Sequence, residues 1–140
     1  MKSKIEIQPI EKSKIDSVDF DNLPFGSVYS DHMLECDHIN GEWQTPIIKP
    51  YSPISLDPAA KIFHYGQSIF EGMKAYKDAD GNPLLFRPLE NWKRLNKSAE
   101  RLVIPHIPEE IFMNGLKKLL EIDTNWIPTN EGSSLYIRPF

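Results

Sequence analysis

Residues 62–76, Ile62-Phe63-His64-Tyr65-Gly66-Gln67-Ser68-Ile69-Phe70-Glu71-Gly72-Met73-Lys74-Ala75-Tyr76, decide how the rest of the chain is arranged. Two glycines bracket a short apolar segment, and after the second glycine the apolar and polar residues alternate with the period of a strand. The stretch therefore predicts a tight helical turn that runs into a strand, with Tyr65 and Phe70 pointing into a concavity. Ordinary aromatic core is the alternative for both rings.

Length and composition limit the kinds of protein that this chain can be. Its 140 residues suffice for one domain whose core needs neither disulfides nor metals. The net charge of -4 argues against nucleic acid and anionic membranes as partners. Cys36 is the only cysteine, which is typical of a reducing compartment. Because neither a membrane-spanning run nor a signal peptide is present in the sequence, we expect a cytoplasmic protein.

The first half of the chain predicts an arm followed by a β-hairpin. Residues 1–24 mix charged and isolated apolar residues, so we expect an extended arm rather than part of the core, and such arms are often ordered only by packing on something else. Asn40-Gly41 is the preferred dipeptide of a two-residue hairpin turn, because both positions require positive φ. We therefore predict a hairpin of about residues 27–37 and 42–48.

The second half predicts another hairpin, two helices and a last strand. A polar turn at residues 77–83 separates the strand of the opening stretch from a short apolar strand at residues 84–86. Apolar residues then recur every three or four positions, which predicts helices over about 89–102 and 109–122. The fold class is therefore α+β: an antiparallel-rich sheet, formed by the two hairpins and a strand within residues 133–140, with both helices on one face.

Two arginines are candidates for binding an anion. Arg94 falls at the border of the apolar face of the first helix, where it could pair with Glu90 one turn earlier or contact a phosphate. Tyr136 and Arg138 share one face of the last strand, about 7 Å apart along the chain, so that a carboxylate could bridge them. A solvated outer face is the alternative for this second pair.

Other chemistry has little support in the sequence. His32, Cys36 and His38 are metal-ligand types within seven residues, but no second pair of ligands closes a site, so we expect no metal centre. Ser68 lacks the second glycine of a nucleophile elbow, and neither a dinucleotide fingerprint nor a phosphate-binding loop is present.

Four motifs follow one another along the chain: Phe25-Gly26-Ser27-Val28-Tyr29-Ser30-Asp31-His32-Met33; residues 64–76; Phe86-Arg87-Pro88 with Asn91 and Arg94; and Ser134-Leu135-Tyr136-Ile137-Arg138-Pro139. Together they resemble the branched-chain amino-acid aminotransferases, which are pyridoxal 5'-phosphate enzymes of fold type IV. The resemblance covers about residues 23–140. It implies that residues 25–140 are the small N-terminal domain of such an enzyme, that residues 1–24 are an arm, and that the whole enzyme is a homodimer.

The resemblance also implies a role for each candidate residue. Arg94 would contact the cofactor phosphate. The pocket for the substrate's side chain would be lined by Phe25, Tyr65, Phe70 and Tyr136, and Arg138 would lie near the polar end of the substrate. The substrates would be leucine, isoleucine or valine and 2-oxo acids, with 2-oxoglutarate as the amino-group acceptor.

The chain departs from the family's pattern in one respect. In these enzymes the lysine that holds the cofactor covalently belongs to a second domain, and no lysine here, including Lys74, matches it. We therefore expect a fragment without catalytic residues, whose binding of the cofactor is in doubt and which cannot transaminate by itself. The alternatives are another fold type IV enzyme, such as a D-amino-acid aminotransferase or an aminodeoxychorismate lyase, and a non-catalytic binding or assembly module.

Overall fold

The computed structural model describes residues 4–140, which form the α+β fold that the sequence predicts. The strands are β1 (Glu6–Ile7), β2 (His32–Glu35), β3 (His38–Ile39), β4 (Glu42–Trp43), β5 (Ile47–Pro50), β6 (Met73–Lys77), β7 (Pro83–Leu85) and β8 (Leu135–Ile137). The α-helices are α1 (Lys61–Tyr65), α2 (Pro88–Arg101) and α3 (Glu109–Ile122), and two short 3₁₀ turns cover Ile15–Ser17 and Thr124–Trp126. None of the helices within residues 4–140 has the length and apolar character that a membrane span requires.

The opening stretch folds as predicted and stands at the centre of one sheet. It forms α1, whose end is marked by Gly66 in the left-handed conformation, and then β6. Both neighbours of β6 are antiparallel to it, in the order β7-β6-β8. Met73 and Ala75 are buried under this sheet, whereas Lys74 is exposed on its other side, as the alternation of the sequence predicts.

The two predicted hairpins form, but they belong to different sheets. The Asn40-Gly41 turn has positive φ at both residues and joins β3 to β4, while β2 and β5 pair beyond it. Strand β5 also pairs with β1, so the second sheet has the order β1-β5-β2. The first strand of this hairpin begins at His32 rather than near residue 27, because the chain turns at Gly26.

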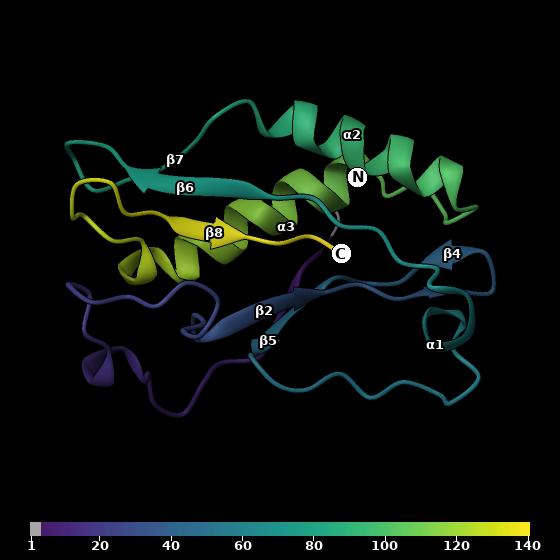
Figure 1. Ribbon diagram of the computed structural model, residues 1–140, viewed down its shortest axis with the longest axis horizontal. Helices are drawn as coiled ribbons and strands as arrows, with labels where there is room; N and C mark the ends of the chain where they lie inside the picture. The colour runs from purple at the N-terminus through teal and green to yellow at the C-terminus, as the bar shows by residue number, and fades with distance from the viewer. Residues whose placement is uncertain (1–3) are drawn as a thin grey trace.

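The helices pack on the inner face of the first sheet and also reach the second. Figure 1 shows α3 running behind β6 and β8 toward β2. One cluster of buried residues joins these elements; its members are Met73, Ala75, Leu95, Phe112, Leu116, Leu120 and Ile127. Gly115 of α3 faces Leu34 of β2 so closely that an added Cβ would meet the leucine side chain at 2.5 Å. Thus α3 links the two sheets.

The arm is fastened to the domain by one buried carboxylate. Asp31 is 8% exposed and accepts hydrogen bonds from Ser13 Oγ at 2.5 Å, Lys14 N at 3.2 Å and Trp126 Nε1 at 2.9 Å. Residues 1–3 of the predicted arm lie outside the described residues, but the remainder packs on the domain through this carboxylate and through β1. That residues 1–24 form an arm stays a prediction.

Because Asp31 acts through its ionised form, we expect the fastening of the arm to weaken in acid. Burial acts to raise the pKa of Asp31, but hydrogen bonds from Ser13, Trp126 and Lys14 outweigh it and leave the pKa below its ordinary value. A carboxyl with a lowered pKa in the folded state stabilises the fold at neutral pH, and this contribution is lost as the pH falls below about 4.

The measurement is urea unfolding of the unchanged chain and of Asp31→Asn at pH 7 and pH 3. The variant should be less stable at pH 7, and the difference in unfolding free energy should shrink at pH 3. Asp16→Asn, at an exposed position of the same arm, is the control. A difference that is equally large at both pH values would contradict the prediction.

Candidate functional site

The first part of the candidate site is an arginine held by a buried glutamate. Arg94 lies on α2, and Glu71 lies directly before Gly72 and β6. Arg94 Nε is 2.6 Å from Glu71 Oε2, and Arg94 Nη2 donates to Glu71 Oε1 at 2.8 Å. The glutamate side chain is 10% exposed and the arginine side chain 64% exposed. The pair therefore joins a fixed carboxylate to a guanidinium that faces solvent.

The pairing of Arg94 with Glu90 that helical spacing offered is wrong. Glu90 instead binds Lys93, with 2.9 Å between Glu90 Oε1 and Lys93 Nζ. Glu71 is supplied from the next layer of the fold, 23 residues before Arg94. Residues that are distant in the sequence can be closer in space than the next turn of a helix, and sequence spacing alone does not reveal them.

The Glu71 carboxylate is ionised because its partners outweigh its burial. Burial acts to raise the pKa of Glu71, but the hydrogen bonds from Arg94 and from the Gly72 N–H, together with the charge of Arg94, leave the pKa below its ordinary range. The same carboxylate raises the pKa of Arg94. Among the described residues, Arg94 hydrogen-bonds to Glu71 through Nη2, whereas Nε is an ion-pair contact of Glu71 Oε2, a buried oxygen that accepts no hydrogen bond. A guanidinium has five N–H donors, so the three that Glu71 does not contact can serve another anion.

These donors belong to a residue that lines an open hollow of about 390 Å³. Arg87 and Lys74 line the same hollow, together with the Gly72 backbone and the side chain of Asn91. Asn91 Nδ2 donates to the Gly72 carbonyl at 3.2 Å, so that α2 is tied to the start of β6 beside the arginine. Glu90 also lines the hollow, where it pairs with Lys93, so the three cationic side chains outnumber the one carboxylate of the lining. An excess of cationic donors suits the phosphate end of a cofactor.

The second part of the site is a cluster of aromatic rings around Arg138. The Arg138 guanidinium carbon lies 4.4 Å from the centre of the Phe70 ring, and Phe25 contacts Tyr136 with 5.9 Å between ring centres. Arg138 Nε and Nη2 donate to Tyr136 Oη at 3.2 Å and 2.9 Å. The two polar groups thus contact each other directly, instead of standing apart with space for a carboxylate between them.

Four of the five residues that were predicted to bind substrate are brought together by these contacts. Phe25 is 85% exposed, Phe70 is 64% exposed and Tyr136 is 37% exposed, so the alternative of ordinary core is wrong for Phe70. The fifth residue, Tyr65, ends α1 and is 82% exposed; among the described residues its ring contact is with His64. The contacts therefore do not bring Tyr65 into the cluster.

Gly72 stands between the two parts of the site. Its carbonyl accepts the hydrogen bond from Asn91 on the arginine side, and a Cβ at this residue would overlap Tyr136 Oη on the aromatic side. The preceding residue is part of the same ladder, because the Glu71 N–H donates to the Pro139 carbonyl at 2.9 Å. Gly72 was noted from the sequence only as the residue before a strand, and Glu71 was given no role, yet both lie between the arginine and the rings.

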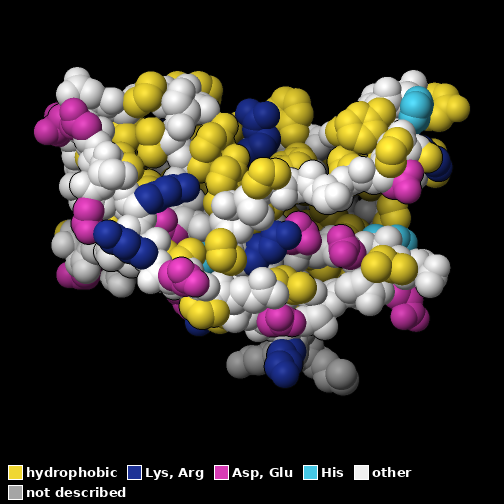
Figure 2. Space-filling view, turned by 90° about the horizontal axis from the view of Figure 1, so that it is seen from below, with side chains coloured by type: hydrophobic (Ala, Val, Ile, Leu, Met, Phe, Trp, Pro, Cys, Tyr) yellow, Lys and Arg dark blue, Asp and Glu magenta, His cyan; other side chains and the backbone are white. Residues whose placement is uncertain are grey.

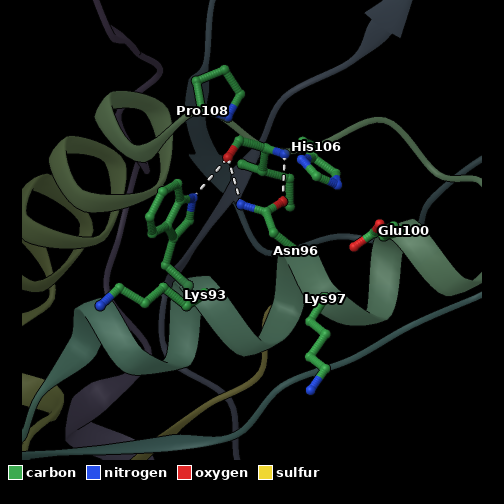
Figure 3. A pocket seen from close by; sticks show the side chains of 8 residues that line it. Lys93, Asn96, Lys97, Glu100, His106 and Pro108 are labelled. Atoms are coloured by element: carbon green, nitrogen blue, oxygen red, sulfur yellow. Dashed lines mark hydrogen bonds between the residues drawn. The ribbon is translucent and has the colours of Figure 1, made fainter.

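A larger hollow of about 490 Å³ lies elsewhere and serves a structural purpose. Figure 3 shows Asn96 of α2 directed at the loop before α3, while Lys97 points away from it. Asn96 Oδ1 accepts from Ile107 N at 2.7 Å, and Trp92 Nε1 donates to the Ile107 carbonyl at 2.7 Å. The polar groups of Asn96 and Trp92 in this hollow are thus used to fasten the loop before α3, so we do not regard the hollow as the functional site.

The candidate metal ligands do not form a cluster. His32 is buried and turned toward Asp123, with 2.6 Å between Nδ1 and Oδ1. Cys36 Sγ donates to the Gln44 carbonyl at 3.2 Å. Within residues 4–140, no three histidine, cysteine, aspartate or glutamate side chains gather in a way that could hold a metal ion.

The fold and the site together define a small α+β domain with a hollow lined by three cationic side chains beside an aromatic cluster. No protein-family model matches the chain. It is 50% identical over 138 residues to branched-chain-amino-acid aminotransferase 2 of Bacillus subtilis, which covers 98% of the chain and 37% of that relative. A branched-chain-amino-acid aminotransferase of Mycolicibacterium smegmatis is 50% identical over 121 residues, or 85% of the chain and 33% of the relative.

A probable branched-chain-amino-acid aminotransferase of Staphylococcus epidermidis is 44% identical over 141 residues, 100% of the chain and 39% of the relative. The resemblance to branched-chain amino-acid aminotransferases is therefore confirmed. The chain spans between 33% and 39% of the length of these curated relatives.

Proposed function

We propose that the chain is the small domain of a branched-chain amino-acid aminotransferase, made up of residues 25–140 with residues 1–24 as an arm packed on it. The complete enzyme would transfer the amino group of leucine, isoleucine or valine to 2-oxoglutarate with pyridoxal 5'-phosphate as cofactor. The names of the relatives support this activity. The cationic hollow and the aromatic cluster, which lie on two sides of Gly72, support separate sites for the cofactor phosphate and for the substrate's side chain.

Arg94 would hold the phosphate of the cofactor with the donors that Glu71 leaves unused. A dianionic phosphate takes forked donors well, and Lys74 and Arg87 add positive charge to the same hollow. When bound, pyridoxal 5'-phosphate supplies an electron sink for the negative charge that develops at the substrate's Cα. In this proposal the chain contributes the anchor for the cofactor and no catalytic residue.

The aromatic cluster would receive the substrate's side chain. Phe25, Phe70 and Tyr136 present exposed rings to one region, with Tyr65 as a fourth ring that would join them in the complete enzyme. An aliphatic side chain is bound there by burial, at about 25 cal/mol per Å² of apolar surface removed from water. Such a pocket accepts leucine, isoleucine and valine because each has an aliphatic side chain that is stabilised by this burial.

Arg138 would allow the same pocket to take 2-oxoglutarate. Its guanidinium donates two N–H groups to Tyr136 Oη, which leaves three donors for a carboxylate. The Phe70 ring beneath it can pack against an aliphatic side chain as well as against the guanidinium. Both the branched-chain amino acid and the dicarboxylic acceptor therefore find suitable groups in one place.

We further propose that the complete enzyme is a cytoplasmic homodimer. Many large apolar side chains of the chain are exposed, among them Phe25, Phe63, Tyr65, Phe70, Phe86 and Phe140. Figure 2 shows hydrophobic side chains gathered along the upper edge of the face it draws, whereas most acidic and basic side chains lie lower. Exposed apolar surface on this scale favours burial against further protein, and the lone cysteine suits a reducing compartment.

The proposed function is tested with a chimera in which this chain replaces the matching part of the Bacillus subtilis relative. The purified chimera should transaminate leucine, isoleucine and valine with 2-oxoglutarate. The 140-residue chain alone should be at least about 10³-fold less active, because it lacks a lysine that matches the family's catalytic position.

The control is the same relative without the replaced part, which should also be inactive. A chimera that is folded by circular dichroism but turns over none of the three amino acids would contradict the proposed function. Turnover by the chain alone would contradict the assignment of the catalytic lysine to another domain.

A further inference from the structure

Glu71 is a buried charge in a position that an apolar residue would ordinarily take. It precedes Met73 by two residues, so it shares the inner face of the strand with Met73 and Ala75, and it is 8% exposed. A carboxylate at such a position is costly to bury unless it is paired and hydrogen-bonded. Here the partners are Arg94 and the Gly72 N–H, which donates to Glu71 Oε1 at 2.9 Å.

The contacts between Glu71 and Arg94 fix the orientation of an arginine side chain that would otherwise be flexible. Arginine has a long side chain, and Arg94 is exposed enough to adopt many rotamers. One hydrogen bond, from Nη2 to Oε1, and one ion-pair contact, between Nε and Oε2, hold the guanidinium at two of its nitrogen atoms and so define its position and its plane. The direction of the three remaining donors is then set by Glu71 and not by the ligand.

We propose that Glu71 is the positioning residue of the phosphate site, a role that rests on the proposed function. It holds the Arg94 guanidinium in the orientation that a phosphate in the hollow requires before that phosphate arrives. Through its neighbour Gly72, which meets Tyr136 Oη, the same two-residue segment sets the distance between the phosphate site and the pocket for the substrate's side chain.

The opposite role for Glu71 is simple neutralisation of Arg94. A carboxylate beside an arginine lowers the positive potential of the hollow, so a purely electrostatic account predicts that its removal strengthens phosphate binding. Positioning predicts that removal weakens it, because the guanidinium then loses orientational freedom on binding. The two accounts thus predict changes of opposite sign.

The experiment compares pyridoxine 5'-phosphate with pyridoxine on the 140-residue chain. Neither probe has the aldehyde that reacts with lysines, and they differ only in the phosphate. Dissociation constants are measured by nuclear magnetic resonance titration up to millimolar concentrations. The unchanged chain should prefer the phosphorylated probe. Glu71→Gln, which keeps the shape of the side chain, should weaken that probe about tenfold and leave pyridoxine unchanged.

Glu90→Gln is the matched control. Glu90 lines the same hollow and also pairs with a cation, Lys93, but it does not hold Arg94. Its removal should not weaken the phosphorylated probe. The Arg94 Nε–Hε resonance supplies a second readout: because Nε lies 2.6 Å from Glu71 Oε2, its chemical shift should be alike in the unchanged chain and in Glu90→Gln, and should change in Glu71→Gln.

The variant Arg94→Gln distinguishes a failure of the positioning role of Glu71 from a failure of the proposed phosphate contact. If Arg94→Gln keeps the preference for the phosphorylated probe, the proposed phosphate contact is wrong. If Arg94→Gln loses the preference while Glu71→Gln retains or strengthens it, only the positioning role is overturned. Should Glu71→Gln fail to fold, Glu71→Asp separates the two accounts: it keeps the charge but draws the carboxylate back from Arg94, so positioning predicts weaker binding of the phosphorylated probe and neutralisation predicts no loss.

Discussion

Replacing Asp123 with alanine is expected to lower the free energy of unfolding by about 3–5 kcal/mol. Asp123 is 3% exposed and follows the end of α3. Its Oδ1 lies 2.6 Å from His32 Nδ1, and its Oδ2 accepts from the His32 backbone N–H at 3.0 Å. The variant would leave two buried polar groups of β2 without their partner, and it would remove a link between that strand and the helix.

The measurement is urea unfolding at pH 7, followed by circular dichroism. Glu121→Ala is the matched control, because this carboxylate lies two residues earlier, is exposed, and pairs with Lys118 at the surface. The control should lose less than about 1 kcal/mol. Equal losses for the two variants would show that the buried pair of His32 and Asp123 adds nothing beyond an ordinary surface contact.

Replacing Arg138 with methionine in the chimera is expected to lower kcat/KM for 2-oxoglutarate by about 10- to 100-fold. Methionine keeps much of the length of the side chain and its contact with Phe70 but removes the charge and the donors. Because the proposed carboxylate contact is made only by the dicarboxylic substrate, kcat/KM for leucine should change by no more than about threefold.

Steady-state kinetics with each substrate varied in turn provides the measurement. Tyr136→Phe is a useful companion, since it removes the hydroxyl to which Arg138 donates and leaves the ring in place. It should give a smaller loss with the same selectivity for 2-oxoglutarate. A loss in Arg138→Met that is equal for both substrates would contradict the proposed contact and indicate a general disturbance of the pocket.

The local elements could be predicted from the sequence because their signals are local. Pro88 at the start of α2 and the Asn40-Gly41 turn lie where the sequence placed them. The division into separate sheets could not be predicted in this way. It depends on pairings such as that of β6 with β8, about 60 residues apart in the chain, and no turn chemistry specifies a pairing between distant segments.

The site could be predicted only in part, because its contacts also join segments that are distant in the sequence. Arg94 was identified as a candidate for an anion, but its partner was sought one helical turn away and proved to be Glu71 on another element. A signal for Glu71 was present: the alternation of Met73 and Ala75, continued back by two residues, places a carboxylate on the buried face. A charge at a core position requires a cation in space, whatever the separation in sequence.

The close approach of Gly72 to Tyr136 has a consequence for enzyme engineering. A side chain at position 72 would displace the tyrosine hydroxyl and, with it, the group that holds Arg138. In the proposed pocket, the shape would therefore be set by positions 72 and 136 together. A mutant library that varies residue 136 while keeping glycine at 72 leaves this close approach unchanged, whereas joint variation of both positions reaches arrangements in which the backbone and the ring have moved together.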